Sequence, residues 1–215
     1  MDNIQIDVFS DTVCPWCRIG KRHLELALAD WEGEPVTVRF RSFFLDPTTP
    51  AEGRDFKANM LAKGGGRRSL EDFFGAPRER GAAVGLTFDF DAIEKSPNTM
   101  LSHRLVYLTP EERRGEVLDA IYTAYFEDGR DIGDIDVLID VAQSCGLDGM
   151  AMREALAGDA AEADVLADLD FARQAGISGV PFFIFNNKYA FSGAQPPDMI
   201  RRVLAQVADD KPAAQ

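Results

Sequence analysis

The chain has few cysteines, few histidines and no long apolar run. Three cysteines and two histidines among 215 residues are too few for the framework of structural disulfides that small secreted domains use. No segment approaches the about 20 consecutive apolar residues of a membrane-spanning helix, and residues 1–7 lack the basic start and apolar core of a signal peptide. We therefore expect a cytoplasmic protein that has no membrane as partner.

Positive charge is also scarce. The sequence has 23 lysines and arginines against 36 aspartates and glutamates, a formal net charge of −13. Proteins that bind nucleic acid or anionic membranes need the opposite balance, so neither is expected as a partner. The length is sufficient for a large hydrophobic core but short for two full domains.

Two of the three cysteines are close together, in the segment Cys14-Pro15-Trp16-Cys17. A short apolar run precedes them and a helical pattern follows, which places them at the start of a helix. There, residues i and i+3 have Cβ atoms about 5–6 Å apart, so the pair can form either a dithiol or a disulfide. The helix N-terminus favours the thiolate of Cys14, while Cys17, one turn further, is expected to be more buried.

A zinc site or two ordinary structural cysteines are the alternatives to a redox pair. Zinc takes four ligands, and Cys145, His23 and His103 do not fall at zinc-binding spacings from the pair. We therefore favour redox chemistry, expect no metal, and expect Cys145 to be an unpaired, partly buried thiol.

The two ends of the chain show β character around single helices. Alternating apolar residues predict a strand over 4–9, a helix follows up to about residue 31, and 36–44 predicts a second strand. Such a β-α-β unit has parallel strands. Near the C-terminus, residues 180–185 and 189–191 predict a hairpin followed by a helix to about residue 208.

The middle of the chain is mostly helical, with one short extended piece predicted at 86–90. One domain built from both chain ends and interrupted by helices fits this plan. We predict a discontinuous domain of residues 1–53 and 175–208, a helical insertion over 54–174, and a loose tail over 209–215. The Phe73-Phe74 pair in the insertion is interpreted as core.

This plan and four sequence segments resemble the DsbA-like branch of the thioredoxin superfamily, and within it the cytoplasmic FrnE-type proteins. Residues 11–20 (DTVCPWCRIG) resemble the active-site segment of these proteins, and 177–183 (ISGVPFF) the loop that carries the family's cis-proline. Residues 192–195 (SGAQ) resemble the segment after the hairpin, and 98–105, with Asn98 and His103, a signature in the insertion.

The resemblance implies an α/β, thioredoxin-like fold with a large helical insertion, and thiol–disulfide oxidoreductase or disulfide isomerase activity. Cys14 would attack a substrate disulfide and Cys17 would resolve the mixed disulfide. The expected partners are protein or peptide thiols and disulfides and a low-molecular-weight thiol reductant. No cofactor is expected besides the redox-active disulfide itself.

A glutathione-dependent transferase or small-molecule isomerase on the same fold is the alternative function. The related kappa-class glutathione transferases and 2-hydroxychromene-2-carboxylate isomerases use serine at the position of Cys14 and bind glutathione. Cysteine at this position favours redox chemistry, with glutathione retained as a conceivable co-substrate. Some FrnE-type proteins carry a second cysteine motif, for which this chain offers Cys145 alone.

Three apolar residues are candidates for substrate binding, and His103, described below, is a fourth. The resemblance implies that Pro181 follows a cis peptide bond and that Val180 faces the dithiol, where its backbone could pair with a substrate strand; a strand-initiating proline is the alternative. Trp16, between the cysteines, is interpreted as part of an exposed apolar platform, with core packing as the alternative.

Four polar residues are further candidates, His103 for substrate binding and Asp11, Arg18 and Asn98 for auxiliary roles. Arg18 could stabilise thiolate charge or be an exposed helix residue without a specific role. Asp11 is either a proton acceptor for Cys17 or an acid that flanks the helix. The resemblance suggests that His103 lines the cleft and carries protons, with a core histidine as the alternative, and Asn98 could equally be a helix cap.

Overall fold

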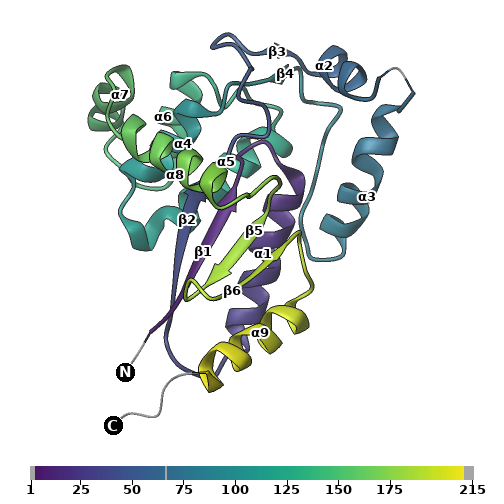
Figure 1. The fold of residues 1–215 in the computed structure, drawn as a ribbon. Coiled ribbons are helices and arrows are strands. Elements are labelled where there is room, and N and C mark those ends of the chain that lie inside the picture. Colours follow the sequence, from purple (N-terminus) through teal and green to yellow (C-terminus); the bar gives the residue numbers. More distant parts are fainter. Residues whose placement is uncertain (1–2, 66, 211–215) are drawn as a thin grey trace.

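A four-stranded sheet forms the centre of the protein in the computed structural model, which describes residues 3–65 and 67–210. Its strand order is β2-β1-β5-β6 (Figure 1). The strands and the two helices that flank them in sequence are β1 (Ile4–Ser10), α1 (Pro15–Ala29), β2 (Val36–Ser42), β5 (Phe182–Phe185), β6 (Tyr189–Ser192) and α9 (Pro197–Asp209).

The alternation in β1 distributes its side chains to the two faces of the sheet. Ile4 and Ile6 are fully buried in the cluster that α1 and α9 form on one face, whereas Phe9 packs with Ala172 and Ile177 on the other. β1 pairs with β2 in parallel and with β5 antiparallel. The parallel β-α-β unit and the C-terminal hairpin are therefore confirmed.

The chain between β2 and β5 is largely helical and lies together at one end of the sheet (Figure 1). Its helices are α2 (Phe56–Lys63), α3 (Leu70–Ala82), α4 (Met100–Leu108), α5 (Arg114–Phe126), α6 (Ile135–Ser144), α7 (Gly149–Ala157) and α8 (Glu162–Gln174). This is the predicted thioredoxin-like fold with a helical insertion; the exact limits given for the two domains stay predictions. Over the described ranges, no helix is long and apolar enough to cross a membrane.

The local structure differs from the sequence-based expectation in two places. Residues 86–90 do not form a strand, because Phe88 and Phe90 turn into the aromatic cluster beside Phe126, whose carbonyl accepts the Asp89 N–H at 2.7 Å. Two short strands, β3 (Arg54–Asp55) and β4 (Lys95–Ser96), were not expected. Of the predicted tail, residue 209 ends α9, and residues 211–215 lie outside the described residues.

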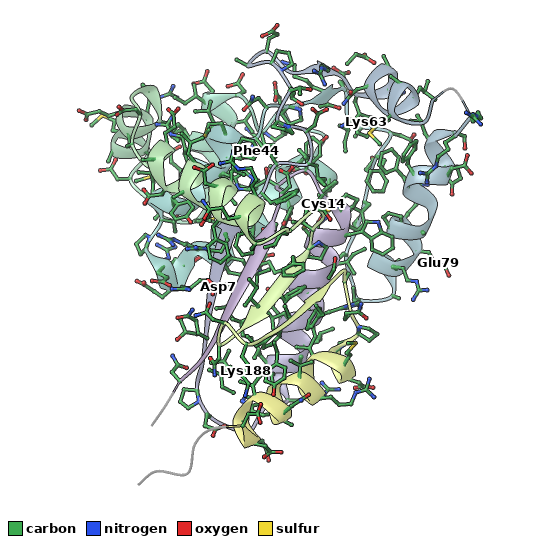
Figure 2. All side chains as sticks on the ribbon, in the orientation of Figure 1. Asp7, Cys14, Phe44, Lys63, Glu79 and Lys188 are labelled. Atoms are coloured by element: carbon green, nitrogen blue, oxygen red, sulfur yellow. The ribbon has the colours of Figure 1, made fainter. Side chains whose placement is uncertain are left out.

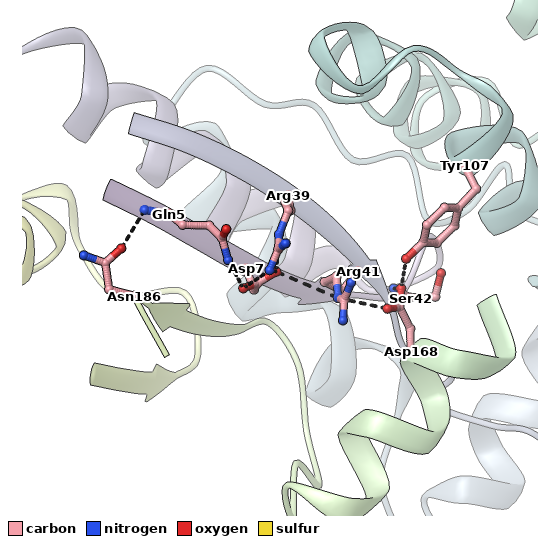
Figure 3. A network of polar contacts seen from close by, with 8 residues as sticks. All are labelled: Gln5, Asp7, Arg39, Arg41, Ser42, Tyr107, Asp168 and Asn186. Carbon is pink, nitrogen blue, oxygen red and sulfur yellow. Dashed lines mark hydrogen bonds and ion pairs between the residues drawn. The ribbon is translucent and has the colours of Figure 1, made fainter. Parts of the chain in front are cut away.

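A buried carboxylate joins the insertion to the sheet (Figure 3). Asp168 of α8 accepts the backbone N–H of Ser42 at 2.8 Å and the hydroxyl of Tyr107, and it pairs with Arg41 Nε at 2.9 Å. Arg41 Nε is also 3.8 Å from Asp7 in β1. Charged groups that are almost fully buried need such partners, so the network fixes α4 and α8 against β1 and β2.

Candidate active site

The two cysteines of the sequence motif occupy the first turn of α1, at the end of the sheet that faces the insertion (Figure 2). Cys14 is the N-cap residue with extended backbone, and Pro15 takes the first helical position, where no N–H is needed. The Cys17 N–H donates to the Cys14 carbonyl at 3.0 Å. Both side chains are thiols, 3% and 1% exposed respectively.

The surroundings of the two sulfurs differ. Burial raises the pKa of the Cys17 thiol well above its ordinary range, and the hydrogen bond that its S–H donates to the neighbouring Cys14 sulfur raises it further. The Cys14 thiol lies 3.8 Å from the Val180 carbonyl oxygen, its acceptor. Cys17 therefore keeps its proton at neutral pH, and Cys14 contacts the loop before β5.

The loop before β5 carries the two residues expected to bind substrate. The Val180–Pro181 peptide bond is cis. The Pro181 carbonyl accepts the Gly193 N–H at 2.8 Å, which ties the loop to the end of β6. Trp16 lies beside the cysteines and is 37% exposed. It is therefore at the surface and not packed in the core.

Asp11 connects the redox loop to the insertion. One carboxylate oxygen accepts the Leu45 N–H at 2.7 Å, and the other is 3.4 Å from His103 Nε2. His103 is 3% exposed, and its ring is 5.3 Å from that of Phe44. His103 is thus a buried residue beside Asp11, as its interpretation as a core histidine has it. Its role in lining the cleft stays a prediction.

Two contacts to the loop of Asp11 and Thr12 were not predicted from the sequence. Thr12 and Ser102 share a buried hydrogen bond of 2.8 Å between their hydroxyls. The Tyr122 hydroxyl is 3.4 Å from the Asp11 carbonyl oxygen, and burial raises the pKa of Tyr122. Ser102 and Tyr122 are ordinary helix residues in sequence. Only their four-residue spacing from Val106 and Phe126, respectively, would have placed them on inward faces.

Arg18 does not face the thiols. Its guanidinium donates to the Thr87 carbonyl at 2.7 Å and to the Thr123 hydroxyl at 3.3 Å, and it forms an ion pair with Glu127. It is 6% exposed, so the interpretation as an exposed helix residue is wrong, and its role in stabilising thiolate charge stays a prediction. Arg18 instead joins α1 to the insertion.

Asn98 shapes the entry to α4. Its amide donates to the Thr49 carbonyl at 2.8 Å, and its oxygen accepts the Met100 N–H at 2.9 Å. Such a turn before a helix is a common use of asparagine, and it agrees with the capping interpretation.

A cavity of about 310 Å³ lies beside the cysteine turn, between the sheet and the insertion. Its size is at the lower end of small-molecule sites. No sequence motif pointed to this cavity, because its walls come from segments far apart in the chain. Phe74, which was expected to be core, also lines it. The main lining residues are Asp11, Val13, Pro15, Asp46, Phe56, Asn59, Met60, Lys63, Phe74, Phe90, Ser96, Tyr125 and Phe126.

Comparison with known proteins gives consistent results. The crystal structure of a probable DsbA oxidoreductase from Streptomyces coelicolor is 33% identical, with a TM-score of 0.87 over 99% of this chain and 93% of that chain. The structure of a 2-hydroxychromene-2-carboxylate isomerase, at 16% identity, has a TM-score of 0.73 over 97% of this chain and all of its own (100%), which shows a shared fold.

A curated relative extends the likeness at the sequence level. The uncharacterized protein YwbO of Bacillus subtilis is 27% identical over 204 residues, which cover 94% of this chain and 96% of the relative. Residues 5–205 match the family described as the DSBA-like thioredoxin domain. The chain belongs to this family of DSBA-like thioredoxin domains.

Proposed function

We propose that the protein is a thiol–disulfide oxidoreductase or disulfide isomerase that works through Cys14 and Cys17. The Cys14 thiolate attacks one sulfur of a substrate disulfide, forms a mixed disulfide and releases the other sulfur as a thiol. Cys17 then loses its proton and attacks Cys14, which releases the second substrate thiol. The protein pair is thereby oxidised by two electrons and the substrate reduced by two; the reverse sequence oxidises a dithiol.

The difference in surroundings between the two sulfurs is the observation that supports these roles. Cys14 caps a helix N-terminus, where unpaired N–H groups and the helix dipole favour negative charge. Cys17 is enclosed, and its burial holds the proton in place. A nucleophile placed where negative charge is favoured and a resolving thiol that stays protonated until the mixed disulfide forms suit stepwise exchange.

Substrate binding is proposed at the surface beside the pair. Trp16 offers exposed apolar area, and the partly buried Val180, which precedes Pro181 and contacts the Cys14 sulfur, is proposed to pair through its backbone with an extended peptide. We place the protein in the cytoplasm, where thiols are kept reduced, so we propose turnover as reductase or isomerase, with a low-molecular-weight thiol resetting the pair.

Reduction of insulin by dithiothreitol tests this proposal. Wild-type protein should accelerate precipitation of the freed B chain, and Cys14→Ser should lose the acceleration. Full activity in Cys14→Ser would overturn the proposal. A thiol-blocked wild-type sample controls for simple chaperone effects on the aggregating chain.

A glutathione-dependent transferase or isomerase is the second candidate, favoured by the fold shared with the 2-hydroxychromene-2-carboxylate isomerase. This function needs bound glutathione and the side chain at position 14 rather than a dithiol. Activity on a small substrate that requires glutathione and survives Cys17→Ala would support it, and loss of that activity in Cys17→Ala would exclude it.

A further inference from the structure

We infer that the cavity beside Cys14 binds the uncharged apolar group of a small organic disulfide, which makes low-molecular-weight aryl disulfides substrates of the pair. The inference rests on the proposed exchange activity and adds a substrate class to it. It follows from three properties of the cavity: its position, the pairing of its polar groups, and the burial of the Cys14 sulfur.

The position of the cavity brings an occupant next to the reactive cysteine. Val13 and Pro15, the chain neighbours of Cys14, both line it. Cys14 belongs to the same buried cluster as the wall residues Phe56 and Phe74. An aromatic group held among these rings therefore lies beside the chain segment that carries Cys14, and the inference is that its attached sulfur reaches the Cys14 sulfur from there.

The polar groups at the cavity are already paired within the protein. Lys63 Nζ, labelled in Figure 2, is 3.0 Å from the Asp46 carboxylate. The Asn59 amide donates to the Ser96 hydroxyl at 3.0 Å. The Thr48 hydroxyl and then Lys63 lower the pKa of Asp46 to about 2, so this ion pair persists at neutral pH.

Because these polar groups already have partners, they offer little to bind a charged ligand. A carboxylate or ammonium placed in the cavity would have to compete for these partners or lose its hydration without compensation. The aromatic walls, by contrast, gain from any apolar group that displaces water. The cavity therefore favours an uncharged aromatic group over a zwitterionic tripeptide such as glutathione.

The burial of Cys14 favours a small substrate as well. At 3% exposure, its sulfur meets a disulfide of a folded protein only after the surrounding loops move. A small disulfide that enters the cavity approaches it from the side of Val13 and Pro15.

The proposed reaction is balanced without a further reagent. The Cys14 thiolate attacks one sulfur of an aryl disulfide, and one aryl thiolate leaves. Cys17 gives up its proton and displaces the second aryl thiolate from Cys14. The protein dithiol becomes the Cys14–Cys17 disulfide, and the aryl disulfide becomes two thiols.

Single-turnover oxidation of the reduced protein tests the inference. The two probes are 4,4'-dithiodipyridine, which is aromatic and uncharged at neutral pH, and bis(2-hydroxyethyl) disulfide, which is small and polar. We expect the rate to saturate with the aromatic probe, because binding precedes reaction, and to rise linearly with the polar one.

A cavity-filling variant and a matched control make the test specific. Met60 is a partly buried lining residue, whereas Met150 is 83% exposed and outside the cavity. Met60→Trp should raise the half-saturating concentration of the aromatic probe about tenfold, a loss of about 1.4 kcal/mol, and leave the polar probe unchanged. Met150→Trp should change neither.

Other results separate the two proposals. Oxidation by both probes without saturation in the wild type, or an equal effect of Met60→Trp on both probes, would overturn this inference and leave the exchange activity standing. No oxidation by either probe would overturn both. If Met60→Trp does not fold, Met60→Phe replaces it, with a smaller shift expected in the same direction for the aromatic probe alone.

Discussion

Gly20 of α1 lies directly against Pro181 of the loop before β5. A Cβ atom at Gly20 would be 2.8 Å from Pro181 Cγ and 3.4 Å from Phe183 Cζ. The first of these distances is shorter than packed carbon atoms allow, so only glycine lets the helix that carries both cysteines approach this loop so closely. The contact thus sets the distance between the Cys14 sulfur and the Val180 carbonyl.

Gly20→Ala is therefore expected to separate α1 from the loop. Overpacking of this kind lowers the free energy of unfolding by about 1–3 kcal/mol, and the displaced loop should slow disulfide exchange as well. Urea unfolding and insulin reduction measure the two effects. Gly179→Ala is the control, because a Cβ there meets no atom within 4 Å; similar behaviour of the two variants would refute the steric argument.

The raised pKa of Cys17 predicts how the stability of the reduced protein depends on pH. Burial is the main cause that keeps Cys17 protonated in the folded state, and the Cys14 sulfur is the second. In the unfolded chain a cysteine ionises at about pH 8.5. Above that pH the unfolded chain binds fewer protons than the folded one, so the free energy of unfolding falls as pH rises.

Urea unfolding of the reduced protein at neutral pH and at about pH 9.5, a unit above the ordinary cysteine pKa, checks this dependence. The wild type should lose more stability over this interval than Cys17→Ser, which lacks the titrating thiol. Equal losses would show that the Cys17 proton is not held more tightly in the folded protein.

Asp11→Asn should change the pH profile of the second chemical step. Burial is the largest cause of the raised pKa of Cys17, and the negative charge of Asp11 adds to it. Asparagine keeps an oxygen for the Leu45 N–H but removes the charge, so the Cys17 pKa should fall. The rate of mixed-disulfide resolution should then reach its plateau at lower pH; an unshifted profile would limit Asp11 to a structural role.

Arg18→Met should reduce stability without changing the chemistry. The substitution leaves the Thr87 carbonyl and the partly exposed Glu127 without their donor, which costs about 2–3 kcal/mol. The folded variant should exchange disulfides at the wild-type rate. A slower exchange with unchanged urea midpoint would instead restore the idea that Arg18 stabilises the thiolate.

The sequence predicts the fold of this protein well where the signal is local. Alternation over residues 4–9 gives β1, and two cysteines at the start of a helical pattern place Cys14 and Cys17 correctly in the first turn of α1. At residues 86–90 the same local reasoning fails. Phe88 and Phe90 pack into the aromatic cluster of the insertion, and this packing outweighs the strand propensity of the segment.

The surroundings of the site depend on contacts between distant segments, which one sequence does not display. Thr12 and Ser102 are 90 residues apart and share a buried hydrogen bond. The partner of Arg18, Glu127, is 109 residues away. Each of these residues is unremarkable in its own segment, so the interpretation of Arg18 rested on its neighbour Cys17 and missed the direction of its side chain.

Trapping of the mixed disulfide on Cys14 tests the central claim most directly. Cys17→Ala, incubated with bis(2-hydroxyethyl) disulfide and mapped by mass spectrometry, should carry the adduct on Cys14, because no resolving thiol remains. Cys145 is the internal control: it ends α6, and burial raises its pKa, so it should stay unmodified. An adduct on Cys145 alone, or none on Cys14, would contradict the account.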